Sequence, residues 1–304
     1  MKLSVFVVTY NQEKYIRQCL DGILMQEVDF DYEVVIGEDH GTDGTRAICE
    51  EYAQKYPQIR LLPLMDNLGI VKNWKRVLSE CTGEYVAMCE GDDYWTDSKK
   101  LQKQLNFMES HREFSICCHN VKDLDIRTEE LVDDRFTHQT PERTSIYDLS
   151  KGNYIRTVSV VFRNDGCVTF INMPLVTPIA DFPLFILLSR EGYIYKMNDC
   201  MAVYRDGGVW SNGNLYMNNT VMIETCKNLL PIFKDKTVRN NLNRIVFRKS
   251  GFVSILCHYQ RKYLKEVKYL LVSLFHIQSY SDVKTFIKNY LLKIGSKDLI
   301  ESLS

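Results

Sequence analysis

Apolar runs alternate with amphipathic segments through the first part of the chain. Leu3–Thr9 is an almost continuous apolar, β-branched run, which predicts a parallel strand buried on both faces. From Tyr15 to Leu24 the apolar residues recur at helical spacing. This alternation continues and predicts a doubly wound α/β domain. The further predicted strands are Glu33–Gly37, Ile59–Leu64, Tyr85–Cys89 and Phe114–His119, and the further predicted helices are Thr45–Tyr56, Val71–Glu80 and Leu101–His111.

The pattern changes after this region. Residues 123–153 are polar and irregular, which predicts loops. From Met217 onward the apolar spacing is helical, so we expect a division into residues 1–214 and a helical region at 215–304. Between them we predict a strand at Thr157–Arg163, a helix at Phe182–Glu191, and two short strands or a hairpin at Ile194–Arg205.

The net charge of −1 conceals an uneven distribution. Residues 1–233 carry 24 Lys and Arg against 34 Asp and Glu, whereas residues 234–304 carry 14 against 5. An acidic body with a basic tail indicates that the tail meets an anionic partner.

Cysteine use and hydropathy bear on the compartment. The ten cysteines form no C-x-x-C pair, and several lie inside apolar runs, as is typical of buried free thiols in a reducing compartment. No uninterrupted apolar stretch reaches the ~20 residues that a membrane-spanning helix needs. The first apolar run meets Asn11, Glu13 and Lys14 at once, unlike a signal peptide. We therefore expect a cytoplasmic protein.

Polar residues collect where the predicted strands end, and carboxylates dominate among them. Glu38-Asp39-His40 follows the second strand, and Glu90-Gly91-Asp92-Asp93 follows the fourth. Helix capping would account for Asn11 and Asp43, but three carboxylates in four residues exceed what one cap requires. Carboxylates at one sheet edge repel one another unless a cation or hydrogen-bond donors balance them. A hard divalent cation, Mn²⁺ or Mg²⁺, suits such oxygen ligands.

Seven segments occur in a characteristic order: VVTYNQEKYIRQCL at 7–20, EVVIGEDHGTDGTR at 33–46, NLGIVKNW at 67–74, YVAMCEGDDYWTDSKKLQKQ at 85–104, TVSVVFRN at 157–164, PIADFPLF at 178–185 and VYRDGGVWS at 203–211. With these segments, which cover roughly residues 1–211, the chain resembles the inverting glycosyltransferase family 2, which has the GT-A fold. The resemblance implies a GT-A nucleotide-sugar-binding catalytic domain at 1–214, and the basic, amphipathic helical region at 215–304 follows it. The resemblance also implies transfer of a sugar to an acceptor hydroxyl, in assembly of a bacterial surface polysaccharide such as capsule, O-antigen or exopolysaccharide.

The resemblance assigns the donor nucleotide to the first two strand ends. Thr9 and Tyr10, with Asn11 beside them, would line the base pocket, where the ring of Tyr10 would stack on the base. The alternative for Tyr10 is core packing. Asp39 would accept the imide N–H of uracil, which favours a UDP-sugar. His40 stands where the family has glycine, and we interpret it as a structural substitution.

The fourth strand end takes the place of the family's D-x-D motif. Asp92 would ligate the metal that bridges the two phosphates, with Gly91 in the donor site. Glu90, longer than the usual aspartate, would contact the ribose or a metal-bound water. Asp93 would either support this site from behind or cap a helix. Trp95 suits an acceptor groove and a buried anchor equally well.

The catalytic base is expected to be Asp181 in the segment PIADFPLF, which would take the proton of the acceptor hydroxyl. The alternative is a helix N-cap, since Pro183 follows closely.

A glycine-rich segment comes next along the chain. Arg205 and Trp210 would lie in a flexible loop that closes over the diphosphate, Arg205 neutralising phosphate charge and Trp210 near the acceptor. A surface ion pair is the alternative for Arg205. The family often has a histidine metal ligand here, but none lies between His138 and His258, and Asp206 is the substitute that the sequence offers.

The C-terminal region suggests partners. Basic amphipathic helices lie on anionic membrane surfaces, which would bring the enzyme to a glycan or lipid-linked glycan acceptor at the inner face of the cell membrane. The alternative is a helical bundle whose apolar stripe is core. No basic motif with interleaved aromatic residues predicts nucleic-acid binding.

Two other functions compete with this interpretation. A nucleotidyltransferase would carry a glycine-rich basic loop after the first strand, yet Thr9–Gln18 contains no glycine. A non-catalytic nucleotide-sugar-binding module would lack the metal carboxylate or the base, yet Asp92 and Asp181 are both present. The glutamate at position 90 keeps this second alternative open.

Overall fold

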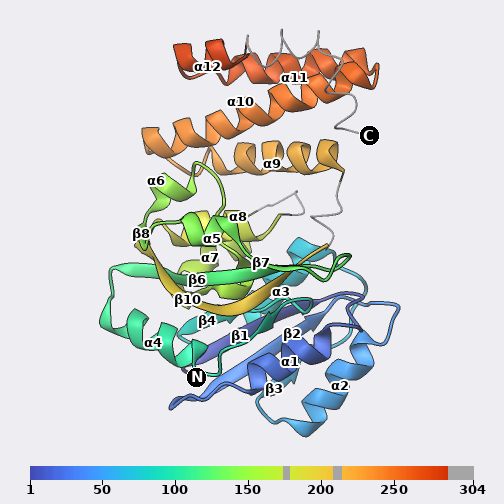
Figure 1. The fold of residues 1–304 in the computed structure, drawn as a ribbon, viewed down its shortest axis with the longest axis vertical. Helices are drawn as coiled ribbons and strands as arrows, with labels where there is room; N and C mark the ends of the chain where they lie inside the picture. The colour runs from blue at the N-terminus through green and yellow to red at the C-terminus, as the bar shows by residue number, and fades with distance from the viewer. Residues whose placement is uncertain (174–178, 208–213, 287–304) are drawn as a thin grey trace. The chain divides into compact units, whose positions relative to one another are not determined.

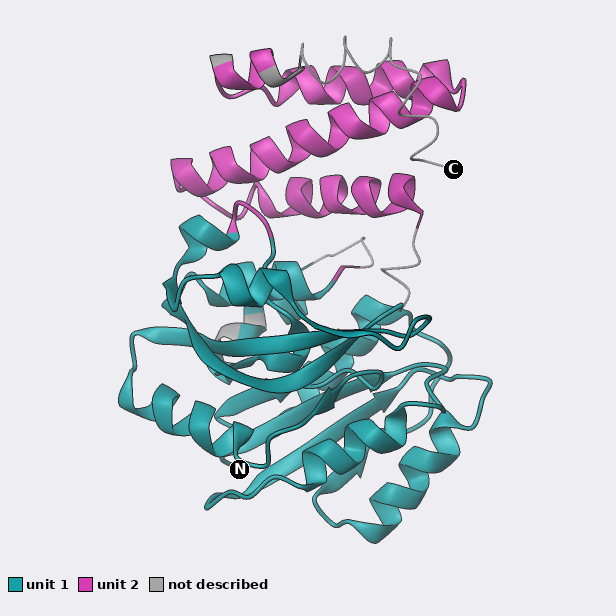
Figure 2. Cartoon of the chain, viewed as in Figure 1, with its two compact units in different colours: residues 1–149, 153–174, 180–212 teal, residues 150–152, 175–179, 213–304 magenta. Residues whose placement is uncertain are grey.

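The computed structural model describes residues 1–173, 179–207 and 214–286. The chain forms two compact units (Figures 1 and 2). Unit 1 comprises residues 1–149, 153–174 and 180–212, and unit 2 comprises residues 150–152, 175–179 and 213–304. The end of the catalytic domain at residue 214 stays a prediction.

Unit 1 is built on one mixed sheet, with strands along the path β3-β2-β1-β4-β9-β6-β10-β5. β3, β2, β1, β4, β6 and β10 run in one direction, and β9 and β5 run against it. The strands are β1 (Leu3–Thr9), β2 (Tyr32–Glu38), β3 (Ile59–Leu61), β4 (Tyr85–Met88), β5 (Tyr94–Trp95), β6 (Phe114–Asp125), β7 (Leu131–Asp133), β8 (Arg143–Thr144), β9 (Val161–Arg163) and β10 (Tyr193–Asp206).

Helices cover both faces of this sheet, as side-chain alternation along β1 shows. Val5 and Val7 join the core formed with α1, α2 and α4, whereas Phe6 points to the other face and contacts Trp74 of α3 edge-on, with 5.0 Å between ring centroids. The helices of unit 1 are α1 (Ile16–Leu24), α2 (Thr45–Lys55), α3 (Ile70–Glu80), α4 (Lys100–Ser110), α5 (Arg135–Gln139), α6 (Ile146–Leu149), α7 (Cys167–Asn172) and α8 (Asp181–Leu188), with 3₁₀ turns at Thr157–Ser159 and Asn164–Gly166.

The predicted alternation of strands and helices to residue 119 is confirmed, but three later predictions are wrong in whole or in part. The strand predicted at Thr157–Arg163 covers only Val161–Arg163, because Thr157–Ser159 form a 3₁₀ turn. Residues 123–153 are not all loop, because β6 continues to Asp125 and short elements follow. Residues 194–205 form neither two strands nor a hairpin but part of one strand, β10, which pairs with β6 through register shifts near Cys200. The amide of Asn120 donates to the carbonyl of Asn198 at 2.9 Å, which bridges this irregular stretch.

Unit 2 is helical, as the spacing after residue 217 predicts. Within it α10 packs against both α9 and α11. Its helices are α9 (Leu215–Leu229), α10 (Lys236–Tyr259), α11 (Tyr263–Phe275) and α12 (Tyr280–Phe286).

Two expectations from composition concern the whole chain. All ten cysteines are free thiols, and all but Cys200 are buried. Across the described ranges, no helix combines the length and apolarity needed to cross a membrane.

Candidate active site

The ends of β1, β2 and β4 meet at one edge of the sheet. The backbone N–H of Asp39, after β2, donates to the carbonyl of Thr9 at 3.0 Å. The N–H of Gly91, after β4, donates to the carbonyl of Val8 at 2.9 Å. The residues to which the sequence assigns donor and metal binding therefore surround one place, the carboxyl edge where doubly wound sheets bind ligands.

The side chain of Asp39 is held in a fixed orientation. One carboxylate oxygen accepts from the N–H of Leu68 at 2.8 Å, and the other accepts from the N–H of Gly69 at 2.9 Å. Each carboxylate oxygen has two lone-pair sites, so Asp39 retains acceptor capacity for a ligand N–H. Asp39 is buried, and these bonds fix the segment before α3.

A tight turn follows Asp39 and explains His40. His40 has φ 57°, in the left-handed region that favours glycine. The side-chain oxygen of Asn11 accepts from the N–H of Thr42 at 2.7 Å, and a carboxylate oxygen of Glu38 accepts from the N–H of Gly41 at 2.6 Å. Asn11 therefore braces this turn, and the interpretation of His40 as a structural substitution agrees with its backbone.

Neither Asn11 nor Asp43 occupies a helix N-cap position, although Asp43 bonds to the start of α2. Gly44 is the N-cap residue of α2, and the carboxylate of Asp43 accepts from the N–H of Thr45, the first residue of the helix, at 3.0 Å. Asn11 does not cap α1, whose N-cap position is Tyr15.

Tyr10 and Thr9 differ in exposure. Tyr10 is 47% exposed, so core packing is the wrong alternative, and its ring is available for stacking. Thr9 is buried, and its hydroxyl donates to the side-chain oxygen of Gln12 at 2.7 Å. A Cβ at Gly91 would lie 2.5 Å from that Gln12 oxygen and 2.6 Å from the Thr9 hydroxyl, so only glycine fits here.

The carboxylates after β4 repel one another. Burial and the charges of Asp92 and Asp181 raise the pKa of Glu90 well above its usual value. Burial also raises the pKa of Asp92, against hydrogen bonds that include one from the side chain of Gln12. Asp181 acts on Glu90 through its charge, which places the predicted base near the predicted metal site although about 90 residues separate them in sequence.

Asp93 is fully buried, and burial with the charges of Asp92 and Glu90 raises its pKa well above the usual value. One oxygen accepts from the backbone N–H of Arg205 at 2.8 Å, and the other has no hydrogen-bond partner. The capping alternative is wrong, because the next helix of more than one turn, α4, begins only at Lys100. Asp93 instead ties the acidic segment to β10.

Arg205 is not in a flexible loop as predicted. It lies in β10, is only 7% exposed, and its guanidinium packs between the rings of Tyr15 and Tyr94, at 4.7 and 4.6 Å from their centroids. Its N–H groups donate to the carbonyl of Asp92 and the side-chain oxygen of Gln18. The surface ion pair is therefore wrong too. Arg205 supports the acidic segment from within, and its charge opposes the rise that burial causes in the pKa of Asp92.

Of the two alternatives for Trp95, an acceptor-groove residue or a buried anchor, the structure shows the buried anchor. It is 2% exposed, so the acceptor-groove alternative is wrong. Its indole N–H donates to the carbonyl of Val158 at 2.9 Å, and the ammonium of Lys100 lies 4.1 Å from the ring centroid. The indole edge is therefore occupied by the hydrogen bond, and one face of the ring by the side chain of Lys100.

Asp181 is the first residue of α8, and Ala180 occupies the N-cap position. The alternative that Asp181 is the N-cap residue is therefore wrong. A carboxylate oxygen of Asp181 accepts from the side-chain amide of Asn153 at 2.8 Å. Burial raises the pKa of Asp181, while bonds to backbone N–H groups and to Asn153 oppose the rise. A carboxylate with a raised pKa that is still oriented by a donor suits general-base chemistry.

Two predicted site residues remain, Trp210 and Asp206. Trp210 lies outside the described residues. Asp206, the suggested substitute for a histidine ligand, ends β10, where its charge acts on Asp123 and Arg127.

Sequence reasoning missed the residues that position the others. Gln12 supports Thr9 and Asp92, Gln18 supports Arg205, and Asn153 supports Asp181. The position of Gln12 shortly after a strand end is a sequence signal that could have identified it. Asn153 has no such signal, because it lies in the stretch that looks like loop.

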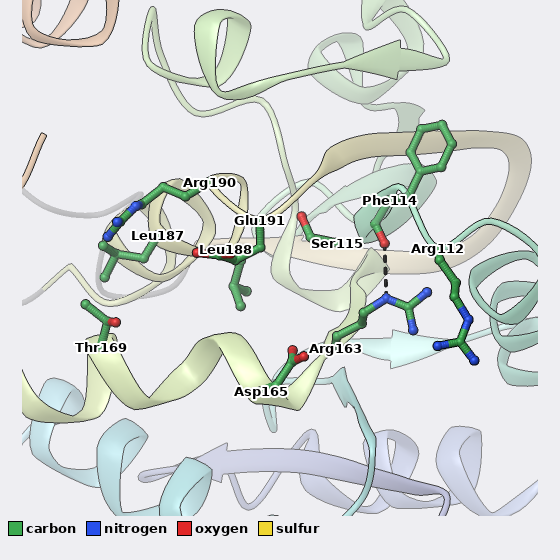
Figure 3. Close-up of a pocket in the computed structure, with 10 residues that line it drawn as sticks. All are labelled: Arg112, Phe114, Ser115, Arg163, Asp165, Thr169, Leu187, Leu188, Arg190 and Glu191. Atoms are coloured by element: carbon green, nitrogen blue, oxygen red, sulfur yellow. Dashed lines mark hydrogen bonds between the residues drawn. The ribbon is translucent and has the colours of Figure 1, made fainter. Parts of the chain in front are cut away.

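A cavity of about 370 Å³ lies at the opposite edge of the sheet (Figure 3). Phe114 begins β6, and Arg163, paired with Tyr85 at the start of β4, ends β9. This cavity therefore lies apart from the carboxylates described above. Its lining is Arg112, Phe114, Ser115, Arg163, Asp165, Thr169, Leu187, Leu188, Arg190 and Glu191.

The acidic segment suits a hard divalent cation in part. Within the described ranges, no three His, Cys, Asp or Glu side chains converge closely enough to hold a metal ion by themselves. Magnesium-type sites commonly use only one or two protein carboxylates and take phosphate oxygens for the rest. Buried carboxylates that repel one another, with one unpaired oxygen on Asp93, match that kind of site.

Comparison with known proteins adds a sequence family. The family model described as "Glycosyl transferase family 2" matches residues 4–171. The uncharacterized protein Rv1520 of Mycobacterium tuberculosis (strain ATCC 25618 / H37Rv) is 39% identical over 212 residues, 68% of this chain and 60% of that protein. The match thus spans less than two thirds of that relative. The putative teichuronic acid biosynthesis glycosyltransferase TuaG of Bacillus subtilis is 29% identical over 205 residues, 67% of this chain and 78% of TuaG.

Solved structures share the fold. A crystal structure of S. aureus TarS 1–349 superposes with a TM-score of 0.64 at 20% identity, covering 97% of this chain and 82% of that one. The mannosyltransferase PcManGT from Pyrobaculum calidifontis, in complex with GDP-Man and Mn²⁺, gives a TM-score of 0.60 at 14% identity, covering 99% and 83%. At these identities the likeness concerns the fold, which is that of GT-A enzymes.

Proposed function

We propose, since this chain belongs to glycosyltransferase family 2, that it transfers a sugar from a nucleotide diphosphate sugar to an acceptor hydroxyl with inversion. The observation that carries the proposal is the gathering of Asp39, Glu90 and Asp92 where β2 and β4 end beside β1, with Asp181 close enough for its charge to raise the pKa of Glu90. Those carboxylates supply a metal-binding group and a base at the place where such sheets bind nucleotides.

The donor nucleotide would lie over the ends of β1 and β2. Tyr10 offers an exposed ring to the base, and Asp39 is oriented by two backbone donors and keeps lone pairs for a ligand N–H. An acceptor at this position pairs with the imide N–H of uracil, which supports a UDP-sugar. The TarS structure with UDP-GlcNAc has the same fold at 18% identity.

Asp92, with Glu90 beside it, would hold Mn²⁺ or Mg²⁺. Such an ion, when bound, stabilises the negative charge of the departing diphosphate. Asp93 and Arg205 keep the segment in place from below, since both are buried and bonded to each other. No protein acid is then needed at the leaving group.

Asp181 would take the proton of the acceptor hydroxyl. The acceptor oxygen forms a bond to the anomeric carbon on the face opposite the diphosphate, the bond to the phosphate oxygen breaks, and the diphosphate leaves with the electron pair. Burial keeps the pKa of Asp181 raised, which makes its carboxylate a stronger base, and Asn153 fixes its direction.

The acceptor is proposed to be a growing surface polysaccharide, free or linked to lipid. TuaG and the amylovoran biosynthesis glycosyltransferase AmsE of Erwinia amylovora are relatives whose names refer to such polymers.

The test is hydrolysis and binding of UDP-, GDP- and dTDP-sugars with and without Mn²⁺. We expect metal-dependent turnover of a UDP-sugar that Asp92→Ala abolishes. Asp97→Ala is the matched control, because Asp97 is a half-buried aspartate of the same region whose carboxylate pairs with Lys103 at 2.8 Å. Binding without turnover would make the chain a sugar-binding module, and absence of binding to every nucleotide sugar would refute the proposal.

A further inference from the structure

Helix α11 has an inner face that packs on the rest of unit 2. The hydroxyl of Ser273 donates to the carbonyl of Phe247 in α10 at 3.0 Å. Glu266, the acidic residue of this helix, pairs with His258 of α10 at 3.1 Å. The inner face is thus occupied by polar contacts within the unit.

The outer face of α11 is apolar and exposed to solvent. Leu264 is 91% exposed and Phe275 is 86% exposed, and the other members are 42% to 60% exposed. At 100° per residue these side chains fall within an arc of about 120°. We call this set the α11 stripe: Tyr263, Leu264, Val267, Leu271, Leu274 and Phe275.

This arrangement is the reverse of an ordinary surface helix, whose apolar stripe faces the core. Scattered exposed apolar residues are normal, but a continuous exposed stripe marks a site that another surface covers. The alternative that the apolar spacing of this region is simply core is therefore wrong for these residues.

Basic side chains border the stripe on one side. Lys265 and Lys268 are exposed, and at 100° per residue they project roughly 100° and 40° from Leu264. Arg261 and Lys262 precede the helix and are exposed as well. With Glu266 turned inward to His258, the outer side of the helix is positively charged.

We propose that the α11 stripe docks on the surface of an anionic lipid bilayer. The apolar side chains enter the boundary between headgroups and acyl chains, and the lysines meet the lipid phosphates. The inference rests on the proposed function only for its purpose, which is to bring the enzyme to a lipid-linked acceptor.

Charge argues for lipid over a second copy of the chain. Two copies joined through the α11 stripe would bring Lys265 and Lys268 of each close to those of the other, and like charges at an interface oppose association. An anionic bilayer turns the same charges into attraction.

The experiment is co-sedimentation of the full chain with vesicles of phosphatidylcholine alone or mixed with an equal part of phosphatidylglycerol. We expect binding to the mixed vesicles that weakens with added salt. The double variant Leu264→Ser/Phe275→Ser should lower the partition coefficient at least about tenfold, because each side chain loses its apolar burial. The double variant Lys265→Glu/Lys268→Glu should remove the preference for phosphatidylglycerol.

The matched control is Leu131→Ser/Val132→Ser on β7, which removes apolar residues exposed by 46% and 47% in unit 1. It should bind vesicles like the wild type. Unchanged binding by Leu264→Ser/Phe275→Ser, or no binding by the wild type, overturns the proposal. Dimers of the wild type that dissociate in that variant would make a second copy the occupant and overturn it too.

A fluorescent probe tests whether another part of the chain covers the stripe. An environment-sensitive dye on Leu264→Cys, in a background with the exposed Cys200 changed to serine, should shift to the blue only when mixed vesicles are added. A dye already blue-shifted and insensitive to vesicles overturns the proposal. Donor hydrolysis without vesicles should be unaffected by the stripe variants, so failure of docking is distinguishable from failure of the proposed function.

Discussion

The hydrogen bond from Asn153 to Asp181 makes a direct prediction about pH dependence. Burial raises the pKa of Asp181, and the amide of Asn153, 2.8 Å from its carboxylate, opposes that rise by stabilising the charged form. Replacing Asn153 with alanine removes that stabilisation, so the pKa of Asp181 should rise further.

The size of the shift follows from the contact. Hydrogen bonds to charged groups contribute about 1.5–3 kcal/mol. Because Asp181 is only half-buried, we take the lower end. One pKa unit corresponds to about 1.4 kcal/mol, so the expected rise is about one unit. Only the ionised carboxylate accepts a proton, hence the acidic limb of the kcat–pH profile should move up by about one unit, while kcat on the alkaline plateau stays nearly constant.

The assay is initial-rate hydrolysis of the nucleotide sugar, in which water replaces the acceptor. Asn153→Asp places a second carboxylate beside Asp181 and should move the limb further in the same direction. Asn164→Ala is the control, because Asn164 is also half-buried and donates its amide to two carbonyls, those of Cys81 and Gly83. If Asn153→Ala lowers kcat at every pH and leaves the limb in place, Asp181 does not govern the profile and the reasoning fails.

Three further predictions concern the supports of the site. Gly91→Ala should lower donor turnover on the order of 100-fold, since its Cβ would displace Gln12, while circular dichroism shows an intact fold. Trp95→Phe should cost about 1–3 kcal/mol in urea denaturation, because the buried carbonyl of Val158 loses its donor, and unchanged stability would contradict the contact. Burial lowers the pKa of Lys100 to about 7, so between about pH 7 and 10.5 the folded chain binds fewer protons than the unfolded chain, and its stability should rise with pH. Lys100→Met should flatten this dependence of stability on pH. Parallel stability curves for the variant and the wild type would refute the prediction.

The sequence predicts the fold where one signal dominates. Leu3–Thr9 is buried at every position, so its apolar run needs no knowledge of its neighbours. β10 is different, because three consecutive exposed residues and then three consecutive buried residues fill its middle, and this irregular middle is defined by pairing with β6. Such pairing joins residues about 80 positions apart, which local periodicity cannot express.

The prediction of loops at residues 123–153 failed for a related reason. Asp123 and Asp134 both pair with Arg156, at 3.0 and 2.9 Å, so charged residues lie inside a folded region. From the sequence alone those charges are typical of loop. Their partners come from separate segments, and the spacing between them carries no local signal.

The proposed site shows the same contrast between the residues expected to act and the residues that support them. Asp92 and Asp181 belong to motifs that a resemblance can locate, whereas Asn153 is defined only by the carboxylate that it contacts. Arg205 shows that a motif can suggest proximity and still mislead about structure. It was expected over the donor, and it lies under the acidic segment between two tyrosine rings.

The negative charge at this edge of the sheet supports the proposal of a bound cation. In the described part of the chain, the charges of Asp92 and Asp181 raise the pKa of Glu90, and Arg205 donates to the carbonyl of Asp92 and to the side chain of Gln18. A nucleotide sugar adds two negative phosphates to this edge. One guanidinium held below the segment does not balance that charge, and like charges at short range in a buried site repel strongly. We therefore expect a donor to bind here together with a divalent cation or with protons on these carboxylates, and proton binding would disable the proposed base at the same time.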